Sequence, residues 1–163
     1  VPPRPRPTES PEHRRFVALA IEGLRAAMTE GGLHEALVRA VLWVRLPSRS
    51  ADERSFAVIR RIRAAVGREA LPLATFKQVV RLQYFMLLID EARAIETLPG
   101  LLPEDPAPRA QALAAIRAVA EAAGDMPPEE ARRMADVERI FAGEPPPADS
   151  GAKVRRLRAP RAA

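Results

Sequence analysis

The stretch LATFKQVVRLQYFMLLI, residues 73–89, decides the fold because its apolar residues nearly encircle the helix that it predicts. They fall on two sides at helical spacing: Phe76, Val79, Val80, Tyr84, Leu87 and Leu88 on one, and Leu82, Phe85, Met86 and Ile89 on the other. A helix that is apolar nearly all round is typical of a protein interior. The sequence therefore predicts that this helix is central and is the most buried in the chain.

Helical patterns continue on both sides of this stretch. Further helices are predicted over residues 11–29, 33–45, 51–66 and 127–142, within DEARAIETLPGLL (residues 90–102) and within EDPAPRAQALAAIRAVAEAAG (residues 104–124). We expect N-caps at Ser10, Asp90 and Asp105, a stop at Pro47 and a left-handed C-terminal residue at Gly124. No segment alternates apolar and polar residues with period two, so no strand is expected. The predicted fold class is all-α, a compact bundle of about six to seven helices.

A faint internal repeat relates the two halves of this bundle with an offset of 75 residues (116 − 41). Val41 and Val44 match Ile116 and Val119, and Phe56, Ile59, Ile62 and Val66 match Ala131, Met134, Val137 and Phe141. Each half is a helix, a short polar turn and a second helix, and neither hairpin can bury its apolar face alone. We therefore expect two pseudo-repeated helical hairpins packed around a buried central helix.

Composition and charge narrow the function classes. The chain has 163 residues, 47% hydrophobic and 4% aromatic, and it has no cysteine. No apolar run is long enough for a membrane span or a signal peptide, so we expect a cytoplasmic protein. The net charge of +5 comes from the ends, since residues 1–10 carry +1 and residues 145–163 carry +4, which leaves the part between them neutral. Because phosphate backbones attract clustered cations, only the tail could bind nucleic acid, and we expect no such role.

The two ends differ in composition from the helical part. Both are rich in proline and charge and poor in apolar residues, which is typical of disorder. Residues 1–10 are predicted to be a disordered linker, residues 11–144 a helical domain, and residues 145–163 a disordered basic tail. Val1 in the place of Met indicates either an alternative start codon or a fragment of a longer chain.

Several pieces of the sequence resemble known helical families. ALVRAVLWVRLPSRSADERSFAVIRRIR (residues 36–63) and ALAAIRAVAEAAGDMPPEEARRMADVERIF (residues 112–141) are similar to the paired hairpins of the tellurite-resistance TerB-like domain. DERSF (residues 52–56) with FKQVVRLQYFMLLIDEARAIETLPGLLP (residues 76–103) resembles the C-terminal helical region of a bacterial family of unknown function. Members of that family carry an α/β-hydrolase-like domain similar to polyhydroxyalkanoate synthases ahead of this region. The resemblance covers about residues 16–143.

The resemblance to TerB-like domains raises the question of a metal site. Those domains hold a divalent cation with acids from turns of the form Asp-Gly-x-x, soon followed by Glu. The two aspartate positions are Ser48 and Ala123 in this chain, and Arg49 takes the glycine position of the first turn, whereas Gly124 keeps that of the second. A hard cation needs several converging oxygens. We therefore predict no metal or cofactor site; the residues that a metal would use are Asp52, Glu53, Asp125, Glu129 and Glu130.

These acids have another role open to them at helix starts. Ser50-x-x-Glu53 has the form of a capping box, in which the serine hydroxyl and the Glu53 carboxylate each accept a backbone N–H. Asp52 adds a negative charge near the positive end of the helix dipole. Glu129 and Glu130 lie in the first turn of the last predicted helix, where the same argument applies. Helix capping thus accounts for the acids without a metal.

No catalytic constellation is apparent. His13 and His34 are the only histidines, and both fall near helix starts, where we expect surface positions. A His34–Glu35 pair would lack a third group to orient it. The chain has no G-x-S-x-G nucleophile elbow, so the chemistry of a neighbouring hydrolase does not transfer to it. We predict no catalytic residue.

Three aromatic residues and one methionine allow two interpretations. Trp43, Tyr84, Phe85 and Met86 are interpreted as core, with an apolar groove for a partner helix or an acyl chain as the alternative. The predicted function is a non-catalytic helical interaction or regulatory module associated with an α/β-hydrolase-like or polyhydroxyalkanoate-synthase-like protein, or forming its C-terminal part. The alternative is a small TerB-like stress-response protein that binds a divalent metal or a small ligand. The oligomeric state stays open.

Overall fold

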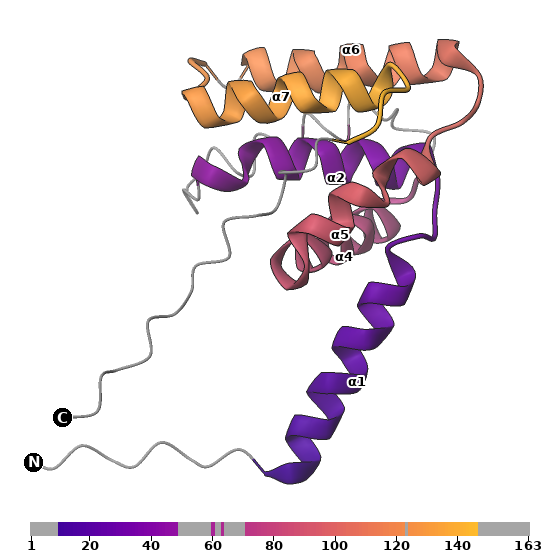
Figure 1. Ribbon diagram of the computed structural model, residues 1–163, viewed down its shortest axis with the longest axis vertical. Helices are drawn as coiled ribbons and strands as arrows, with labels where there is room; N and C mark the ends of the chain where they lie inside the picture. The colour runs from indigo at the N-terminus through magenta and orange to yellow at the C-terminus, as the bar shows by residue number, and fades with distance from the viewer. Residues whose placement is uncertain (1–9, 49–59, 61–62, 64–70, 123, 147–163) are drawn as a thin grey trace, which may run out of the picture.

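The computed structural model describes residues 10–48, 60, 63, 71–122 and 124–146, and within these ranges it contains helices and turns but no strand. The described α-helices are α1 (Pro11–Ala27), α2 (Leu33–Arg45), α4 (Leu73–Ile89), α5 (Glu91–Glu96), α6 (Pro106–Ala122) and α7 (Pro128–Phe141). Two 3₁₀ turns, η1 (Leu46–Ser48) and η2 (Leu98–Leu101), follow α2 and α5 (Figure 1). The predicted all-α bundle is confirmed.

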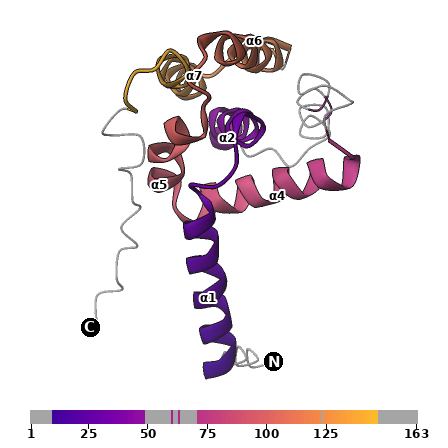
Figure 2. The ribbon, with the colours of Figure 1, turned by 90° about the vertical axis from the view of Figure 1, so that its right-hand side faces the viewer.

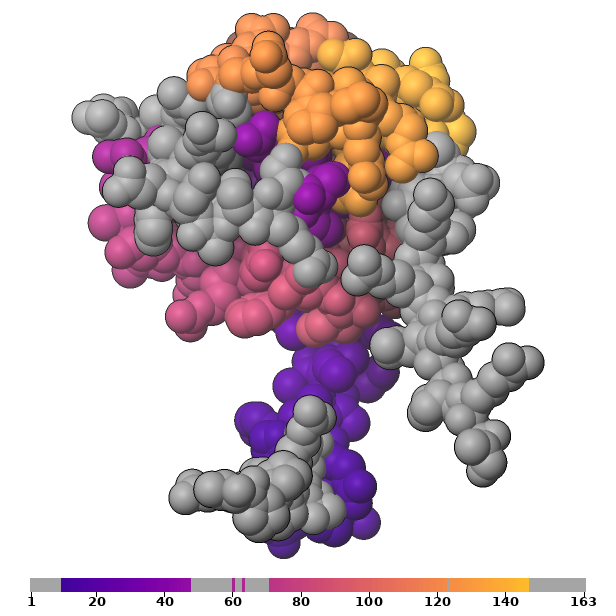
Figure 3. Space-filling model, turned by 90° about the vertical axis from the view of Figure 1, so that its left-hand side faces the viewer, coloured from indigo at the N-terminus to yellow at the C-terminus, as the bar shows by residue number. Residues whose placement is uncertain are grey.

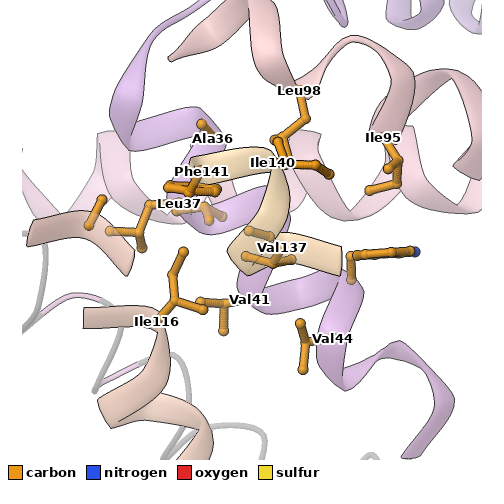
Figure 4. Packing of buried hydrophobic residues seen from close by; sticks show 14 of the residues in the cluster. Ala36, Leu37, Val41, Val44, Ile95, Leu98, Ile116, Val137, Ile140 and Phe141 are labelled. Atoms are coloured by element: carbon orange, nitrogen blue, oxygen red, sulfur yellow. The ribbon is translucent and has the colours of Figure 1, made fainter. Parts of the chain in front are cut away.

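The centre of the bundle is α2. It packs against α4 on one side and against α6 and α7 on the other (Figures 1 and 2). Its buried residues are Ala36, Leu37, Val38, Arg39, Ala40, Val41, Trp43 and Val44. Figure 4 shows side chains of α2 beside those of α6 and α7, among them Leu37, Val41, Ile116, Val137 and Phe141. Burial of each Leu- or Val-sized side chain contributes about 1.5–3 kcal/mol, so α2 is the main source of the core among the described helices.

The prediction that residues 73–89 form the central helix is wrong, although its bounds are those of α4. The buried residues of α4 are Phe76, Gln83, Met86 and Leu87. Large apolar side chains on its other side are exposed: Leu73, Leu82, Tyr84, Phe85 and Leu88. The physical reason is that α2 packs along one side of α4, and the contacts of α4 with α1 and α5 leave its outer stripe exposed.

The helix ends follow the local signals in the sequence. The side chains of Ser10, Asp90 and Asp105 each accept a hydrogen bond from a backbone N–H in the first turn of the following helix, at 3.1, 3.1 and 3.0 Å. Gly124 has φ +93°, a left-handed conformation that suits glycine because it has no Cβ. These predicted caps are confirmed.

Some predictions fall outside the described residues. They include the predicted helix over residues 51–66 apart from residues 60 and 63, which are helical, and with it the second helix of the first pseudo-repeat. Most of the two predicted tails and the position of Ala123 also lie outside. No helix among the described residues has the length and hydrophobicity needed to span a bilayer.

Candidate interaction surface

Two of the acidic metal candidates, Glu129 and Glu130, lie in α7, and a third, Asp125, lies just before it. Glu130 is 0% exposed, and its carboxylate accepts a hydrogen bond from Arg45 Nη1 at 2.7 Å. Glu129 is exposed and lies 3.4 Å from Arg133 Nη2, one turn further along the helix. Asp125 is exposed in the preceding turn. The structure therefore spreads these three acids over different environments instead of joining them at one point.

A metal site is not assembled within the described residues. They contain no group of three or more His, Cys, Asp or Glu side chains that could hold a metal ion. Asp52 and Glu53, the other two candidates, lie outside the described residues, as does the Ser50 capping box. Their role stays a prediction.

The histidines are not joined into a catalytic pair either. His13 is exposed, as expected, but His34 is half-buried. The Glu35 carboxylate accepts a hydrogen bond from the backbone N–H of Gly32 at 2.8 Å. A Cβ on Gly31, which has φ +113°, would lie 2.7 Å from Glu35 Cγ. Glu35 therefore folds back over the glycine turn and closes the start of α2.

A buried arginine, missed by the sequence reasoning, joins four segments. Arg39 on α2 is 0% exposed. Its Nε donates to Gln83 Oε1 on α4 at 2.7 Å, and its Nη1 donates to the backbone oxygens of Met28 at 3.1 Å and Ala94 at 3.0 Å and to Thr97 Oγ1 at 3.1 Å. These contacts link α2 to the end of α1, to α4 and to α5. A signal was present, because Arg39 interrupts a helix whose other positions from 36 to 44 are all apolar.

The surroundings of Arg39 also change its acidity. Burial lowers the pKa of Arg39 to about 10, and the negative charge of Glu35 offsets part of this shift. The guanidinium thus remains charged at neutral pH. Its hydrogen-bond partners are neutral groups, and since its Nε and Nη1 donors are already engaged by the fold, it is a structural cation and not an anion-binding site.

Trp43 takes part in a second polar link, between α2, α5 and α7. Its Nε1 donates to Glu91 Oε1 at 2.8 Å, and the same carboxylate oxygen lies 3.0 Å from Arg133 Nη2. The Arg133 guanidinium lies over the Trp43 ring, 5.1 Å from its centroid, in a cation–π geometry. With Trp43 and Met86 buried, the core interpretation holds for these two residues.

The other two aromatic residues do not fit that interpretation. Tyr84 is 41% exposed and Phe85 is 43% exposed, with ring centroids 6.2 Å apart. Leu88, one turn after Tyr84 on α4, is 46% exposed. Lys77 and Arg81 are exposed on the same side of the helix. Since α4 contains no Asp or Glu, its outer face combines large apolar groups with positive charge.

Helix α1 presents a second apolar face. It has no buried residue, and residues 11–20 are all exposed, with Phe16 at 70% and Leu19 at 74%. Figures 2 and 3 show α1 projecting from the body of the bundle as a stalk. Its C-terminal end is fixed, because Met28 O accepts from Arg39 and Arg25 Nε lies 3.4 Å from Asp90 Oδ2.

We call these two faces together the α1–α4 surface; its members are Phe16, Val17 and Leu19 of α1 and Leu73, Lys77, Arg81, Leu82, Tyr84, Phe85 and Leu88 of α4. The outer face of α4 lies opposite the side that packs on α2. In Figure 2, α2 lies above α4 and α1 projects below it, so the outer face of α4 and the stalk lie on the same side of the bundle. Exposed apolar groups gathered in this way are typical of an interaction surface.

Comparison with known proteins gives a relative of unknown function. The chain is 42% identical over 137 residues to a Rhizobium meliloti protein described as "Uncharacterized protein in ackA 5'region". The match covers 82% of this chain but 19% of that protein, so the chain spans about a fifth of the length of its relative. No family model matches the chain, and no solved structure matches it.

Proposed function

We propose that this chain is a non-catalytic helical interaction or regulatory module that acts as part of a larger assembly. The observation that carries the proposal is the Rhizobium relative, in which a segment 42% identical to this chain makes up 19% of a much longer polypeptide. A segment of that kind has a neighbouring part of the protein to act on. The polar groups of the described bundle agree with a structural role, since Arg39, Glu91 and Glu130 are engaged in contacts within the fold.

The kind of neighbour follows from the sequence resemblance. A bacterial family with a similar helical region carries an α/β-hydrolase-like domain, similar to polyhydroxyalkanoate synthases, ahead of it. We propose that this module associates with such a domain, either within one polypeptide or as a separate protein. The module then supplies a binding surface and regulates the neighbour, while the nucleophile elbow and the rest of the chemistry belong to the neighbour.

The reading frame immediately upstream of Val1 provides the first test. We expect it to encode an α/β pattern with a G-x-S-x-G motif, in frame or in the adjacent gene. An independent start with its own ribosome-binding site, and no hydrolase-like sequence in that frame, would rule out the fused form. The second test is co-expression of the upstream product with this chain, followed by size-exclusion chromatography. A hydrolase-like product that elutes apart from the chain at every concentration would refute the association.

A further inference from the structure

The α1–α4 surface contains two unpaired faces that match each other in length and chemistry. Residues 11–20 of α1 are all exposed and span about 15 Å at 1.5 Å per residue. The exposed stretch of α4 from Lys77 to Leu88 spans a similar length, about 18 Å. Each face presents large apolar side chains, and an isolated helix of this length is held mainly by packing of such a face. Both halves of a helix–helix contact are therefore present on one chain.

The fold prevents α1 from covering α4 of its own chain. The end of α1 is held beside the end of α4 by the Arg25–Asp90 ion pair at 3.4 Å and by the hydrogen bond from Arg39 to Met28 O at 3.1 Å. From there α1 runs away from the bundle (Figures 1 and 2). The outer face of α4 thus stays open within one molecule, and an α1 helix from a second molecule can reach it.

One charge on the α1 face is complementary to the charges on the outer face of α4. On α1, Glu12 lies one turn before Phe16 on the same side. Glu22 is paired with Arg25 at 3.1 Å within the helix, and the exposed Arg14 and Arg15 do not share the side of Phe16. On α4, the exposed charges are Lys77 and Arg81, and the helix has no acid. If Phe16 lies opposite Phe85, a parallel register places Glu12 opposite Arg81.

We propose that the chain forms a symmetric dimer in which α1 of each copy packs on the outer face of α4 of the other. A closed two-fold interface needs a surface that is complementary to itself. The α1–α4 surface meets this condition because its α1 face and its α4 face can pair between two copies. Parallel pairing of α4 with α4 would instead bring Lys77 and Arg81 of the two copies together, which like charges disfavour. The exchange of α1 covers both apolar faces in one step, and it does not depend on the proposed hydrolase-like neighbour.

Light scattering coupled to size-exclusion chromatography of the full chain tests the dimer. We expect twice the mass of one chain for the unaltered protein. Phe16→Asp with Leu19→Asp on α1, and Tyr84→Asp with Leu88→Asp on α4, should each weaken the dimer by at least about a hundredfold, since each pair removes two large apolar contacts. Ala114→Asp with Ala118→Asp, at exposed positions of α6 with the same helical spacing, is the matched control and should stay dimeric. Circular dichroism should show unchanged helicity in every variant.

Mixing the two surface variants tests the exchange itself. In a mixed dimer, the intact α1 of the α4 variant meets the intact α4 of the α1 variant, so one of the two contacts survives. We expect the mixture to contain dimer at concentrations at which neither variant alone does. If the α4 variant alone stays dimeric, pairing through α1 only would replace the proposed exchange. If the unaltered chain is monomeric at all concentrations, the proposal fails, and the α1–α4 surface would be left to the neighbouring domain without affecting the proposed function.

Discussion

The substitution Gln83→Leu should be more destabilising than its conservative volume suggests, because it removes an acceptor from a buried cation. Gln83 is 3% exposed, and its Oε1 accepts from Arg39 Nε at 2.7 Å. A hydrogen bond to a charged group contributes about 1.5–3 kcal/mol, and an unsatisfied buried charge costs more than a neutral one. We expect the free energy of unfolding to fall by about 3 kcal/mol.

Adding Arg39→Met to the Gln83→Leu variant should lower the free energy of unfolding little further. Burial costs the charged form of Arg39 about 3 kcal/mol, because it lowers the pKa of this guanidinium to about 10 and each pKa unit corresponds to about 1.4 kcal/mol. Arg39→Met removes this cost but leaves the Met28 oxygen without its Arg39 donor, while the Ala94 oxygen keeps Thr97 Oγ1 at 3.3 Å. In the Gln83→Leu background these effects nearly cancel, so the net change should be below about 1 kcal/mol.

Urea unfolding of the unaltered chain, the two single variants and the double variant measures the coupling. Trp43, the only tryptophan and 1% exposed, reports unfolding by fluorescence. We expect the double variant to be about 2 kcal/mol more stable than the sum of the two single losses predicts. This coupling energy is within the range for residues in one network. Additive losses, or a Gln83→Leu cost below about 0.5 kcal/mol, would show that Arg39 does not depend on this acceptor.

The unaltered chain and the double variant also allow a test of how stability depends on pH, for which the direction of the change is known. The pKa of Arg39 is lowered in the fold to about 10, so between that pH and its ordinary pKa the unfolded chain binds the proton more than the folded one. The cost of burying the charge is fully present below about pH 10 and falls as the pH rises toward the ordinary pKa of arginine. The stability of the unaltered chain relative to the double variant should therefore rise by about 1 kcal/mol between about pH 8 and 11. No change, or a fall, would contradict the buried charge.

Four further substitutions test other parts of the chain. Arg45→Ala removes the cation that lies 2.7 Å from buried Glu130 and should cost about 3 kcal/mol in urea unfolding, whereas Glu130→Gln, which removes the charge itself, should cost less. Gly124→Ala forces a Cβ onto φ +93° in open space, and we expect a loss of about 1 kcal/mol from strain alone in thermal unfolding. Glu53→Ala should cost about 0.5–2 kcal/mol as a lost helix cap, with no change in calorimetric titrations with Ca²⁺, Mg²⁺, Zn²⁺ and Mn²⁺. A metal affinity that disappears with Glu53 while the fold stays intact would restore the metal-binding alternative.

The helix limits could be predicted because they depend on local chemistry. The observed bounds of α2 and α4 are those predicted, residues 33–45 and 73–89, since the Gly31-Gly32 turn, Pro47 and Asp90 act within a few residues of themselves. The N-caps at Ser10 and Asp105 are of the same kind. Each of these signals needs only a backbone N–H or a preferred φ a short distance along the chain.

The role of Arg39 could not be predicted, because its partners are distant in sequence. Gln83 is 44 residues away and Ala94 is 55 residues away, and no spacing rule connects them. Sequence patterns also treat an arginine as a surface residue, since Arg is rarely fully buried unless paired. Arg39 also donates to Met28 O and so fixes the end of α1. The direction of the stalk is therefore a property of the folded core and not of the α1 sequence.

The mistaken position of α4 has a different cause, which a comparison with α7 makes clear. Both helices have one buried side, but α7 places charged residues such as Glu129, Arg132 and Arg139 on its exposed side, whereas α4 places Tyr84, Phe85 and Leu88 there. Hydrophobic patterning measures how much of a helix is built for burial, and it does not say which molecule buries it. In the proposed dimer, α2 covers one side of α4 and α1 of the second copy covers the other. The predicted burial of residues 73–89, wrong for the single chain, would then hold for the assembly, although α2 and not α4 is the central helix.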